Sequence, residues 1–323
     1  MVKKIGVLTS GGDAPGMNAA VRAVVRLGID KGLEVVGIYN GWAGVIDAHF
    51  EDMNSRSVSN IIQRGGTILR SSRSKEFRTE EGLKKAAANL NNKGIDAIVA
   101  IGGNGTFAGA LDLCKYWDGQ VIGIPGTIDN DLYGTDETLG YDTAVNTALD
   151  AVDKVRDTAE AHERFFLIEV MGRDAGFIAL SVGLAGGAEE VAIPETKTDI
   201  DGMIDRLNEG RKKGKTSSII MVAEGDEEGG AMEIAKKLAE KSGESHRCVV
   251  LGHIQRGGSP TARDRLLGLK LGAFAVQGLL EGKTGVMAGE QGGKCTFVPL
   301  EDTIKKRKPV DPYLQDIFRA LAK

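Results

Sequence analysis

Two carboxylates, Asp129 and Asp131, lie two positions apart in the segment PGTIDND at residues 125–131, directly after an apolar run. In an extended segment, side chains two residues apart point to the same side. One carboxylate could then accept a proton from a hydroxyl group while the other helps to hold a cation. A stretch rich in Asn and Asp is equally typical of a simple turn. The segment alone therefore leaves a catalytic and a structural interpretation open.

Two glycine-rich turns, SGGD at residues 10–13 and GGNGT at 102–106, also follow apolar runs. Backbone amides at a helix N-terminus bind anions, and the helix dipole favours negative charge there. On neighbouring strands the two turns could cradle a polyphosphate, although plain turns between a strand and a helix have the same composition.

Three further glycine-rich patterns are weaker evidence for phosphate binding. Residues 103–108 fit G-x-G-x-x-A, but the acidic residue expected about 20 positions later in a dinucleotide-binding fold is absent. Residues 210–216 and 278–284 are each one residue short of a P-loop, and neither follows a predicted strand. We interpret both of these segments as helix ends with solvated lysines.

Cationic side chains follow two more apolar runs: Arg173 comes after residues 165–170, and the segment HIQR at 253–256 comes after residues 249–251. A guanidinium group pairs bidentately with phosphate oxygens, so arginines gathered beyond strand ends would suit a sugar phosphate. A lone arginine is more often a solvated surface charge.

These segments need a sheet to position them. Short apolar runs alternate with helical spacing, which predicts parallel strands covered on both faces and hence an α/β protein. In such sheets ligands bind beyond the carboxyl ends of the strands. The strands are predicted at residues 5–8, 33–39, 95–101, 121–124, 165–170, 190–193, 219–222 and 249–251, and the helices at 18–31, 106–113 and from about 176 to 184.

Length, composition and net charge exclude several classes of protein. At roughly 150 residues per domain, 323 residues suggest two domains. The net charge of -4 gives no electrostatic reason to expect a nucleic acid or an anionic membrane as partner. The apolar run at the start is too short for a signal peptide, and no run approaches the roughly 18 apolar residues of a membrane helix. We therefore expect a cytoplasmic protein.

Taken together, these motifs resemble the 6-phosphofructokinase family, in its short bacterial ATP-dependent form. The matching segments run through the whole chain in order: IGVLTSGGDAPGMNAAVR, IQRGGT, GIDAIVAIGG, PGTIDNDLYGTD, EVMGRDAG, AGGAEE and VLGHIQRGGSP. The resemblance implies two similar lobes, each a largely parallel sheet flanked by helices, with the active site in the cleft between them. It assigns residues 1–138 plus 252–304 to a nucleotide-binding lobe, and 139–251 plus 305–323 to a sugar-phosphate-binding lobe.

The resemblance also implies a reaction: transfer of the γ-phosphoryl group of ATP to the 1-hydroxyl of fructose 6-phosphate in glycolysis, with Mg²⁺ as cofactor. Asp129 resembles the base that takes the hydroxyl proton, which is worth roughly 10²- to 10⁴-fold in rate. Arg173 resembles the group that stabilises the transferring phosphoryl. Asp131 matches a carboxylate that holds the metal through water, and Thr127 a further catalytic position. The matching sugar-phosphate contacts are Thr127, Ile128, Asp129, Arg164, Met171, Gly172, Arg173, Glu224, Arg247, His253, Ile254, Gln255 and Arg256.

The matching nucleotide-site positions are Gly12, Arg73, Ser74, Gly103, Asn104, Gly105 and Thr106. Asn104 stands where the family usually has the aspartate that binds magnesium, and an amide offers only a neutral oxygen to a hard cation. Trp42 and Ser74 replace the usual aromatic pair near adenine. Gly105 and Gly126 favour ATP, since relatives that use pyrophosphate typically place Asp and Lys at these two positions.

An effector site and a homotetramer are also implied. Arg164 and Arg247 reach across a subunit interface in this family. The positions that match its effector site for ADP or phosphoenolpyruvate are Arg22, Arg26, Arg156, Glu189, Lys213 and Lys215. Ser55, Arg56 and Asn60 depart from that site, which predicts altered effector control.

Two alternatives to an active ATP-dependent kinase stay open. The first is a weakly active or regulatory paralogue that binds the ligands, suggested by Asn104 and the altered effector positions. The second is an enzyme that uses pyrophosphate or a related sugar phosphate. NAD kinases and diacylglycerol kinases share a GGDG-like turn but lack the TIDND, MGR and HIQRGG segments.

Overall fold

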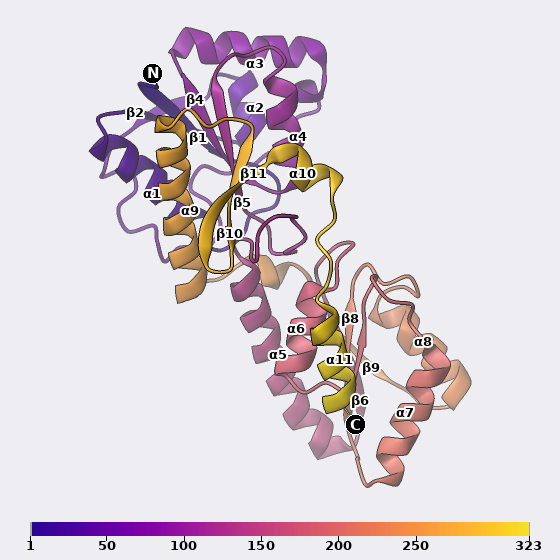
Figure 1. Ribbon diagram of the computed structural model, residues 1–323. Coiled ribbons are helices and arrows are strands. Elements are labelled where there is room, and N and C mark those ends of the chain that lie inside the picture. Colours follow the sequence, from indigo (N-terminus) through magenta and orange to yellow (C-terminus); the bar gives the residue numbers. More distant parts are fainter. Residues whose placement is uncertain (1, 323) are drawn as a thin grey trace. The chain divides into compact units, whose positions relative to one another are not determined.

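The computed structural model of the protein describes residues 2–322 and divides into two units (Figure 1). Unit 1 comprises residues 1–128, 132–143 and 256–308, and unit 2 comprises 129–131, 144–255 and 309–323. The boundaries predicted after residues 138, 251 and 304 fall a few residues before these. Assignment of one ligand to each lobe stays a prediction.

Unit 1 is built on a seven-stranded sheet in the order β11-β10-β5-β4-β1-β2-β3. The pairs from β10 through β5, β4 and β1 to β2 are parallel, whereas β3 and β11 pair antiparallel at the two edges. The strands are β1 (Lys4–Thr9), β2 (Glu34–Ile38), β3 (Phe50–Met53), β4 (Ala97–Gly102), β5 (Gln120–Pro125), β10 (Val286–Gln291) and β11 (Lys294–Pro299).

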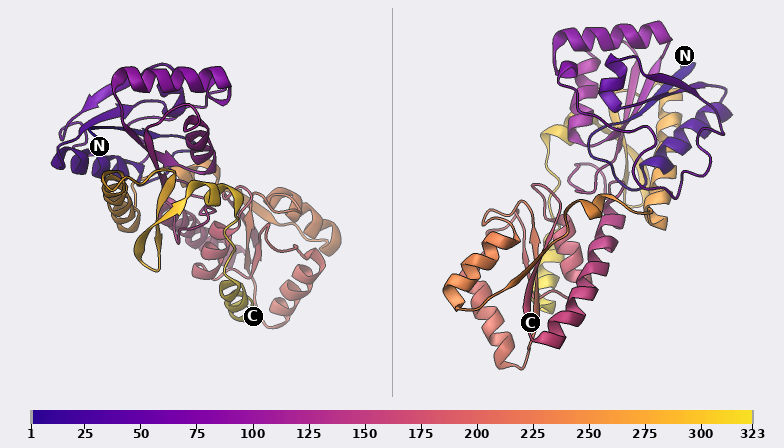
Figure 2. Two further views of the ribbon diagram at one scale, coloured as in Figure 1. Left: turned by 45° about the horizontal axis from the view of Figure 1, so that its top comes forward. Right: turned by 180° about the vertical axis from the view of Figure 1, so that it is seen from behind.

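Helices cover both faces of this sheet, with α1 and α9 on one face and α2, α3, α4 and α10 on the other (Figures 1 and 2). Buried strands with continuous apolar sequence require this cover because neither face can meet water. The helices are α1 (Met17–Asp30), α2 (Gly41–Ile46), α3 (Glu80–Lys93), α4 (Asn104–Leu113), α9 (Ala262–Leu280) and α10 (Leu300–Lys305), with a 3₁₀ turn, η1 (Glu76–Arg78).

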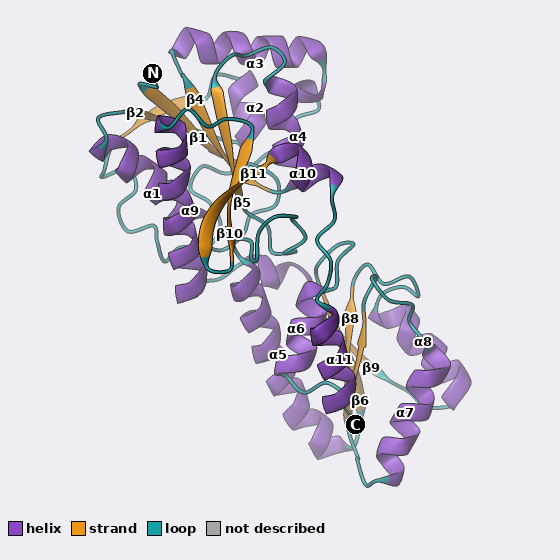
Figure 3. Ribbon diagram, in the orientation of Figure 1, coloured by secondary structure: helices purple, strands orange, loops and turns teal. Residues whose placement is uncertain are grey.

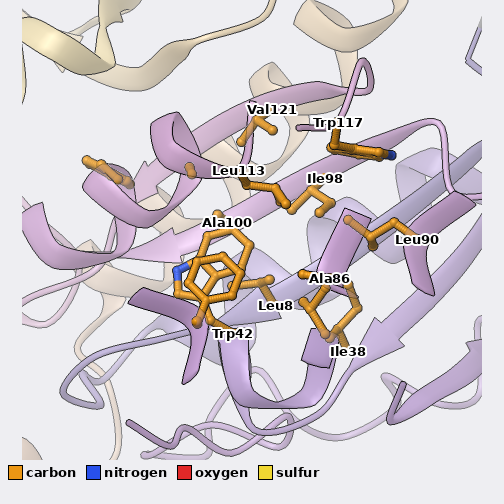
Figure 4. Close-up of a cluster of buried hydrophobic side chains, with 14 of the residues drawn as sticks. Leu8, Ile38, Trp42, Ala86, Leu90, Ile98, Ala100, Leu113, Trp117 and Val121 are labelled. Atoms are coloured by element: carbon orange, nitrogen blue, oxygen red, sulfur yellow. The ribbon is translucent and has the colours of Figure 1, made fainter. Parts of the chain in front are cut away.

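The core on the α2–α3–α4 face is a continuous cluster of buried apolar side chains (Figure 4). Leu8 and Ile98 contribute from the central strands, and Trp42 and Leu113 from the covering helices. On the opposite face, α1 and α9 approach backbone to backbone. A Cβ at Gly272 would lie 2.7 Å from the Ala20 carbonyl oxygen, so only glycine fits there.

Unit 2 contains a four-stranded, wholly parallel sheet in the order β7-β8-β6-β9. Helices α5, α6 and α11 cover one face, and α7 and α8 the other (Figure 3). The elements are α5 (Tyr141–His162), β6 (Phe165–Val170), α6 (Phe177–Ala185), β7 (Glu190–Ala192), α7 (Ile200–Lys212), β8 (Ser218–Ala223), α8 (Ala231–Ser242), β9 (Arg247–Val250), the 3₁₀ turn η2 (Gly252–Arg256) and α11 (Pro312–Leu321).

The structure confirms the α/β fold class with mostly parallel sheets, and each predicted strand overlaps an observed one. The segments 210–216 and 278–284 lie across the C-terminal ends of α7 and α9, as predicted for helix ends. Among the residues described, no helix combines the length and the apolar character that crossing a membrane requires.

Asp264, in the first turn of α9, is the most strongly shifted carboxyl in unit 1. Burial raises its pKa from 3.8 to about 6, against hydrogen bonds from Thr143 and Gly140 that favour the ionised form. The folded protein therefore binds this proton more tightly than the unfolded chain. The stability that the group contributes rises as the pH falls from about 6 to about 4, and it is lost as the pH rises again.

We predict that the unfolding free energy of the wild type, relative to that of Asp264→Asn, rises by up to about 3 kcal/mol between pH 7 and pH 4. Urea denaturation of both proteins at several pH values measures this difference. For Thr79→Ala, which removes the uncharged cap of α3, the corresponding difference should be independent of pH. A constant difference for Asp264→Asn as well would contradict the buried-carboxyl account.

Candidate functional site

The carboxyl ends of β1, β4 and β5 lie side by side in unit 1, because the three strands pair in parallel. Thr9 is in register with Ile101, and Gly102 with Pro125. The segments that leave these strands are therefore neighbours, as two backbone bonds show: the Ser10 amide donates to the Ile101 carbonyl at 2.9 Å, and the Gly126 amide to the Gly102 carbonyl at 2.9 Å. Both glycine turns and the start of the PGTIDND segment thus share one edge of the sheet.

The first glycine turn is shaped by Arg256. A Cβ at Gly12 would collide with the Arg256 guanidinium group, which also donates to the Asp13 carbonyl at 3.4 Å. Ser71 donates from its hydroxyl to the Gly11 carbonyl at 2.6 Å. Arg256, predicted as a sugar-phosphate contact, therefore lies in unit 1 beside the glycine turn.

The second glycine turn leads into α4, whose first residue is Asn104. The Thr106 hydroxyl donates to the Ser10 carbonyl at 3.1 Å, which ties this turn to the first one. Gly103 is the N-cap of the helix and has an extended conformation. A Cβ at Gly103 would lie 3.8 Å from the Cβ of Thr127, with nothing nearer. A Cβ at Gly105 would meet nothing within 4 Å. The first turn of α4 therefore has room beside Gly103 and Gly105, and anion binding there stays a prediction.

Asn104, the first residue of α4, is the predicted metal ligand in this turn. Its Oδ1 atom is buried and has no hydrogen-bond partner within residues 2–322. Over the same residues, His, Cys, Asp and Glu side chains form no cluster of three or more that could hold a metal ion. Mg²⁺ usually takes only one or two protein ligands, and phosphates and waters supply the rest. A single oxygen without a partner fits an ion that arrives bound to phosphate.

The PGTIDND segment is not extended throughout, and this corrects the sequence prediction. Ile128 and Asp129 lie in a turn, and Asn130 has φ 55°. Asn tolerates this left-handed conformation because its short side chain bonds locally. The period-two argument for placing Asp129 and Asp131 on the same side therefore fails. The backbone before the turn is held by Thr138, whose hydroxyl donates to the Thr127 carbonyl at 2.5 Å.

In unit 2, the turn after β6 carries Met171, Gly172 and Arg173. Gly172 has φ 146° and Arg173 φ 54°, so two consecutive residues adopt conformations that L side chains rarely take. The Glu224 carboxylate holds them by accepting from the Arg173 amide at 2.8 Å and the Gly172 amide at 3.3 Å. Gln255 accepts from the Met171 amide at 2.8 Å. The exposed Arg173 side chain thus projects from a backbone fixed by two side chains that the sequence predicts as ligand contacts.

Arg164 and Arg247 lie apart from this turn. Arg164 precedes the first residue of β6, and Arg247 is the first residue of β9, paired beside Phe166. Both are therefore at the amino ends of strands whose carboxyl ends carry Met171 and η2. Six residues of strand span about 20 Å, so this chain does not bring these two arginines to its own Arg173.

The predicted effector residues fall into two groups. In unit 1, Arg22 and Arg26 on α1 donate to the carbonyls of Val58 and Ser55 at 3.5 and 3.4 Å, and burial together with the Arg26 charge lowers the pKa of Arg22. In unit 2, Glu189 lies 3.9 Å from Arg156 and 3.6 Å from Lys215.

A cavity of about 700 Å³ in unit 2 was not predicted from the sequence. Its lining joins Glu189, Lys213 and Lys215 to apolar side chains such as Met203 and Phe318. Glu189, Lys213 and Lys215 lie in segments that the sequence patterns single out, whereas no motif marks Met203 or Phe318.

Trp42 and Ser74 have structural partners. Trp42 is buried and stacks on Phe77, with ring centroids 4.7 Å apart, and it belongs to the core shown in Figure 4. The Ser74 hydroxyl accepts from the Phe77 amide at 3.1 Å. Ser74 thus holds the turn that places Phe77 against Trp42. Gly109 lies against both rings, since a Cβ there would be 3.0 Å from the Trp42 Nε1 atom and 3.1 Å from the Phe77 ring.

Comparison with known proteins assigns this architecture to a family. The phosphofructokinase family matches residues 4–279. The chain is 55% identical over 321 residues to ATP-dependent 6-phosphofructokinase 1 of Thermus thermophilus, covering 99% of this chain and 100% of the relative. It is 51% identical over 322 residues to ATP-dependent 6-phosphofructokinase 2 of Bacteroides thetaiotaomicron, covering 99% of each chain.

A solved phosphofructokinase from Saccharomyces cerevisiae superposes with a TM-score of 0.88 at 35% identity, over 99% of this chain and 46% of that one. The family match and the identities over almost the full length are decisive. The chain belongs to the phosphofructokinase family.

We predict that Glu224→Ala loosens the turn at residues 171–173, because it removes the acceptor of two amides in unfavourable conformations. Loss of hydrogen bonds to an exposed carboxylate should cost about 1 kcal/mol of stability and accelerate amide exchange in a peptide covering residues 170–176. Glu227→Ala is the matched control, since Glu227 is also exposed and accepts from a backbone amide, that of Thr198, in another loop. Equal exchange at 170–176 in both variants would contradict the assignment.

Proposed function

We propose that this chain transfers the γ-phosphoryl group of ATP to the 1-hydroxyl of fructose 6-phosphate, giving fructose 1,6-bisphosphate and ADP. The observation that carries the proposal is the shared sheet edge of unit 1, where both glycine turns adjoin the segment that leads into Asp129. Relatives at 51–55% identity are named ATP-dependent 6-phosphofructokinases, and the chain is a phosphotransferase of this family. Its place in glycolysis follows from this activity, and the proposal extends to a cytoplasmic location.

The nucleotide is proposed to bind at the two glycine turns. Amides at the start of α4 and the helix dipole would neutralise phosphate charge, with Gly12, Gly103, Gly105 and Thr106 allowing close approach. Arg73 and Ser74 complete the proposed contacts. The preference for ATP as the phosphoryl donor rests on the room around Gly105 and Gly126. The Gly105 side chain position is open, so an α-phosphate can lie there, whereas a Cβ at Gly126 would lie 2.9 Å from Met17 and 3.1 Å from Ile101. Both positions favour ATP over pyrophosphate.

The residues proposed to bind the sugar phosphate include Thr127, Ile128, Asp129, Arg173 and Arg256. Glu224 and Gln255 keep the backbone of residues 171–173 in place. The Arg173 side chain, carried on this held backbone, suits the charge of a transferring phosphoryl because a planar guanidinium pairs bidentately with phosphate oxygens. The other proposed contacts are Arg164, Met171, Gly172, Glu224, Arg247, His253, Ile254 and Gln255.

In the proposed mechanism, the Asp129 carboxylate accepts the proton of the 1-hydroxyl as that oxygen bonds to the γ-phosphorus, and the bond from phosphorus to the β-γ bridging oxygen of ATP breaks. Asp129 is 5% exposed and follows the fully buried Ile128. Limited access of water favours transfer to the sugar over hydrolysis. Arg173 stabilises the charge on the transferring group.

A divalent ion, Mg²⁺, is proposed to accompany the nucleotide and to neutralise charge on its phosphates. Asn104 Oδ1 and, through water, Asp131 would hold it. Support comes from the buried Asn104 oxygen without a partner and from the few protein ligands that Mg²⁺ requires.

The proposal includes a homotetramer and an effector site. Arg164 and Arg247 lie at the amino ends of their strands, away from Arg173, which suits arginines that serve the site of a partner subunit. ADP or phosphoenolpyruvate is the proposed effector. The residues proposed to bind it are Arg22, Arg26, Arg156, Glu189, Lys213 and Lys215.

We predict that Asp129→Asn lowers kcat by about 10²- to 10⁴-fold with little change in the KM of either substrate, because only proton acceptance is lost. Coupled assays with ATP and with pyrophosphate measure it, and the wild type should turn over with ATP. Asp136→Asn provides a matched control, since Asp136 is an exposed aspartate a few residues further along the chain. Wild-type turnover with pyrophosphate alone would refute the donor assignment. Binding of both substrates without turnover would favour the regulatory paralogue.

We predict that Asn104→Asp lowers the Mg²⁺ concentration needed for half-maximal activity several-fold, since a carboxylate is a better ligand for a hard cation and is favoured at a helix N-terminus. A magnesium titration at fixed ATP measures the shift. Asn91→Asp, a change of the same type in the last turn of another helix, α3, should leave the titration unchanged. An unchanged midpoint for Asn104→Asp would remove Asn104 from the proposed metal site.

A further inference from the structure

Asp264 is the centre of a hydrogen-bond cluster whose donors all come from one short segment. The side chain is 1% exposed. One carboxylate oxygen accepts from the Gly140 amide at 2.8 Å, and the other accepts from the Thr143 amide at 2.9 Å and from the Thr143 hydroxyl at 2.5 Å. Asp264 thereby fixes the start of α5 to the start of α9.

The segment that Asp264 holds also grips the loop that leads to Asp129. The Leu139 amide donates to the Pro125 carbonyl at 2.9 Å, and the Thr138 hydroxyl donates to the Thr127 carbonyl at 2.5 Å. Gly126 and Leu139 form an isolated parallel β-bridge. Three consecutive residues of the loop are therefore tied to residues 138 and 139.

Close packing reinforces these bonds. Gly140 has φ 94°, and a Cβ there would lie 3.1 Å from Ile128 and 2.7 Å from Ala14. Thr138, Leu139 and Ile128 are fully buried. Because protein interiors have few voids, Gly140 has little room to move toward Ile128, and Ile128 adjoins Asp129 in the chain.

We propose that Asp264 is a positioning residue for catalysis, which fixes the backbone of residues 125–128, and through it the Asp129 carboxylate, by anchoring residues 138–143. The catalytic consequence rests on the proposed role of Asp129. The structural consequence, a rigid loop, does not.

The chemistry of the anchor requires a carboxylate. The Gly140 and Thr143 amides are two fixed donors, and a carboxylate offers each of them an accepting oxygen. An amide offers one oxygen and one NH₂ group, so in Asp264→Asn one of the two donors faces another donor. Asp264→Ala leaves both amides without their acceptor. We therefore expect Asp264→Asn to loosen the loop and Asp264→Ala to loosen it further.

A purely structural role predicts a different pattern. Asp264 could serve only to join two helices, and its loss would then lower stability without changing loop order or kcat selectively. Thr79→Ala provides the comparison, because Thr79 caps α3 by accepting from the Gly82 amide at 3.1 Å and contacts no part of residues 125–143 through hydrogen bonds in the described structure.

The test compares Asp264→Asn, Asp264→Ala and Thr79→Ala in the full-length protein by three measurements: melting temperature, hydrogen–deuterium exchange of a peptide covering residues 125–131, and steady-state kinetics. For the Asp264 variants we expect faster loop exchange and a fall in kcat of about ten- to a hundredfold, the scale for a slightly misplaced catalytic group, with the KM for ATP nearly unchanged. For Thr79→Ala we expect a lower melting temperature and neither of the other effects.

A double-mutant cycle sharpens the test. Thr138→Val removes the bond to the Thr127 carbonyl but leaves the Asp264 bonds intact. If both residues act through the same segment, the combined loss of kcat in Thr138→Val with Asp264→Asn is smaller than the product of the single losses. Independent, multiplicative losses would contradict a shared path. If Asp264→Ala does not fold, Asp264→Asn and the double-mutant cycle still test the positioning role.

Failure of this inference differs from failure of the proposed function. Loop exchange in the Asp264 variants equal to that in Thr79→Ala would overturn the positioning role, whatever the activity. A wild type without kinase activity would overturn the proposed function. Faster loop exchange would then still establish the anchor.

Discussion

The candidate functional residues of unit 1 depend on one constraint, the parallel pairing of β1, β4 and β5. Parallel strands end at the same edge of a sheet, and the register here sets Thr9 beside Ile101 and Gly102 beside Pro125. Three separate segments consequently leave the sheet side by side, and their first backbone groups bond to one another. An open helix N-terminus and the approach to a buried carboxylate arise at one place because the strands, and not the loops, fix the positions.

Two kinds of local support complete the arrangement, and both use side chains that accept from backbone amides. Asp264 anchors the start of α5 and so the loop before Asp129. Glu224 and Gln255 hold the unfavourable backbone at residues 171–173. In each case a carboxylate or carboxamide offsets the cost of an irregular main chain.

Sequence patterns predicted the strands and glycine turns well, because continuous apolar runs and Gly-Gly pairs are local signals. They were silent on the 22-residue helix α5, whose Thr143 amide donates to Asp264 from another helix. They wrongly predicted an extended segment from Asp129 to Asp131, because Asn130 has a left-handed conformation. This conformation is set by the tertiary structure and not by a local pattern. Likewise, the remoteness of Arg164 and Arg247 from Arg173 depends on strand direction, and the cavity lined by Glu189 and Phe318 joins residues far apart in the chain.

The most direct test of the account is to identify the product atom by atom. Purified protein would be incubated with ATP, Mg²⁺ and fructose 6-phosphate, and phosphorus NMR with proton coupling would follow both reactants. The account predicts equal amounts of ADP and of a sugar bisphosphate whose new phosphorus couples to the protons on C1. ADP formed with inorganic phosphate and no sugar bisphosphate, or a phosphate attached at another carbon, would contradict it.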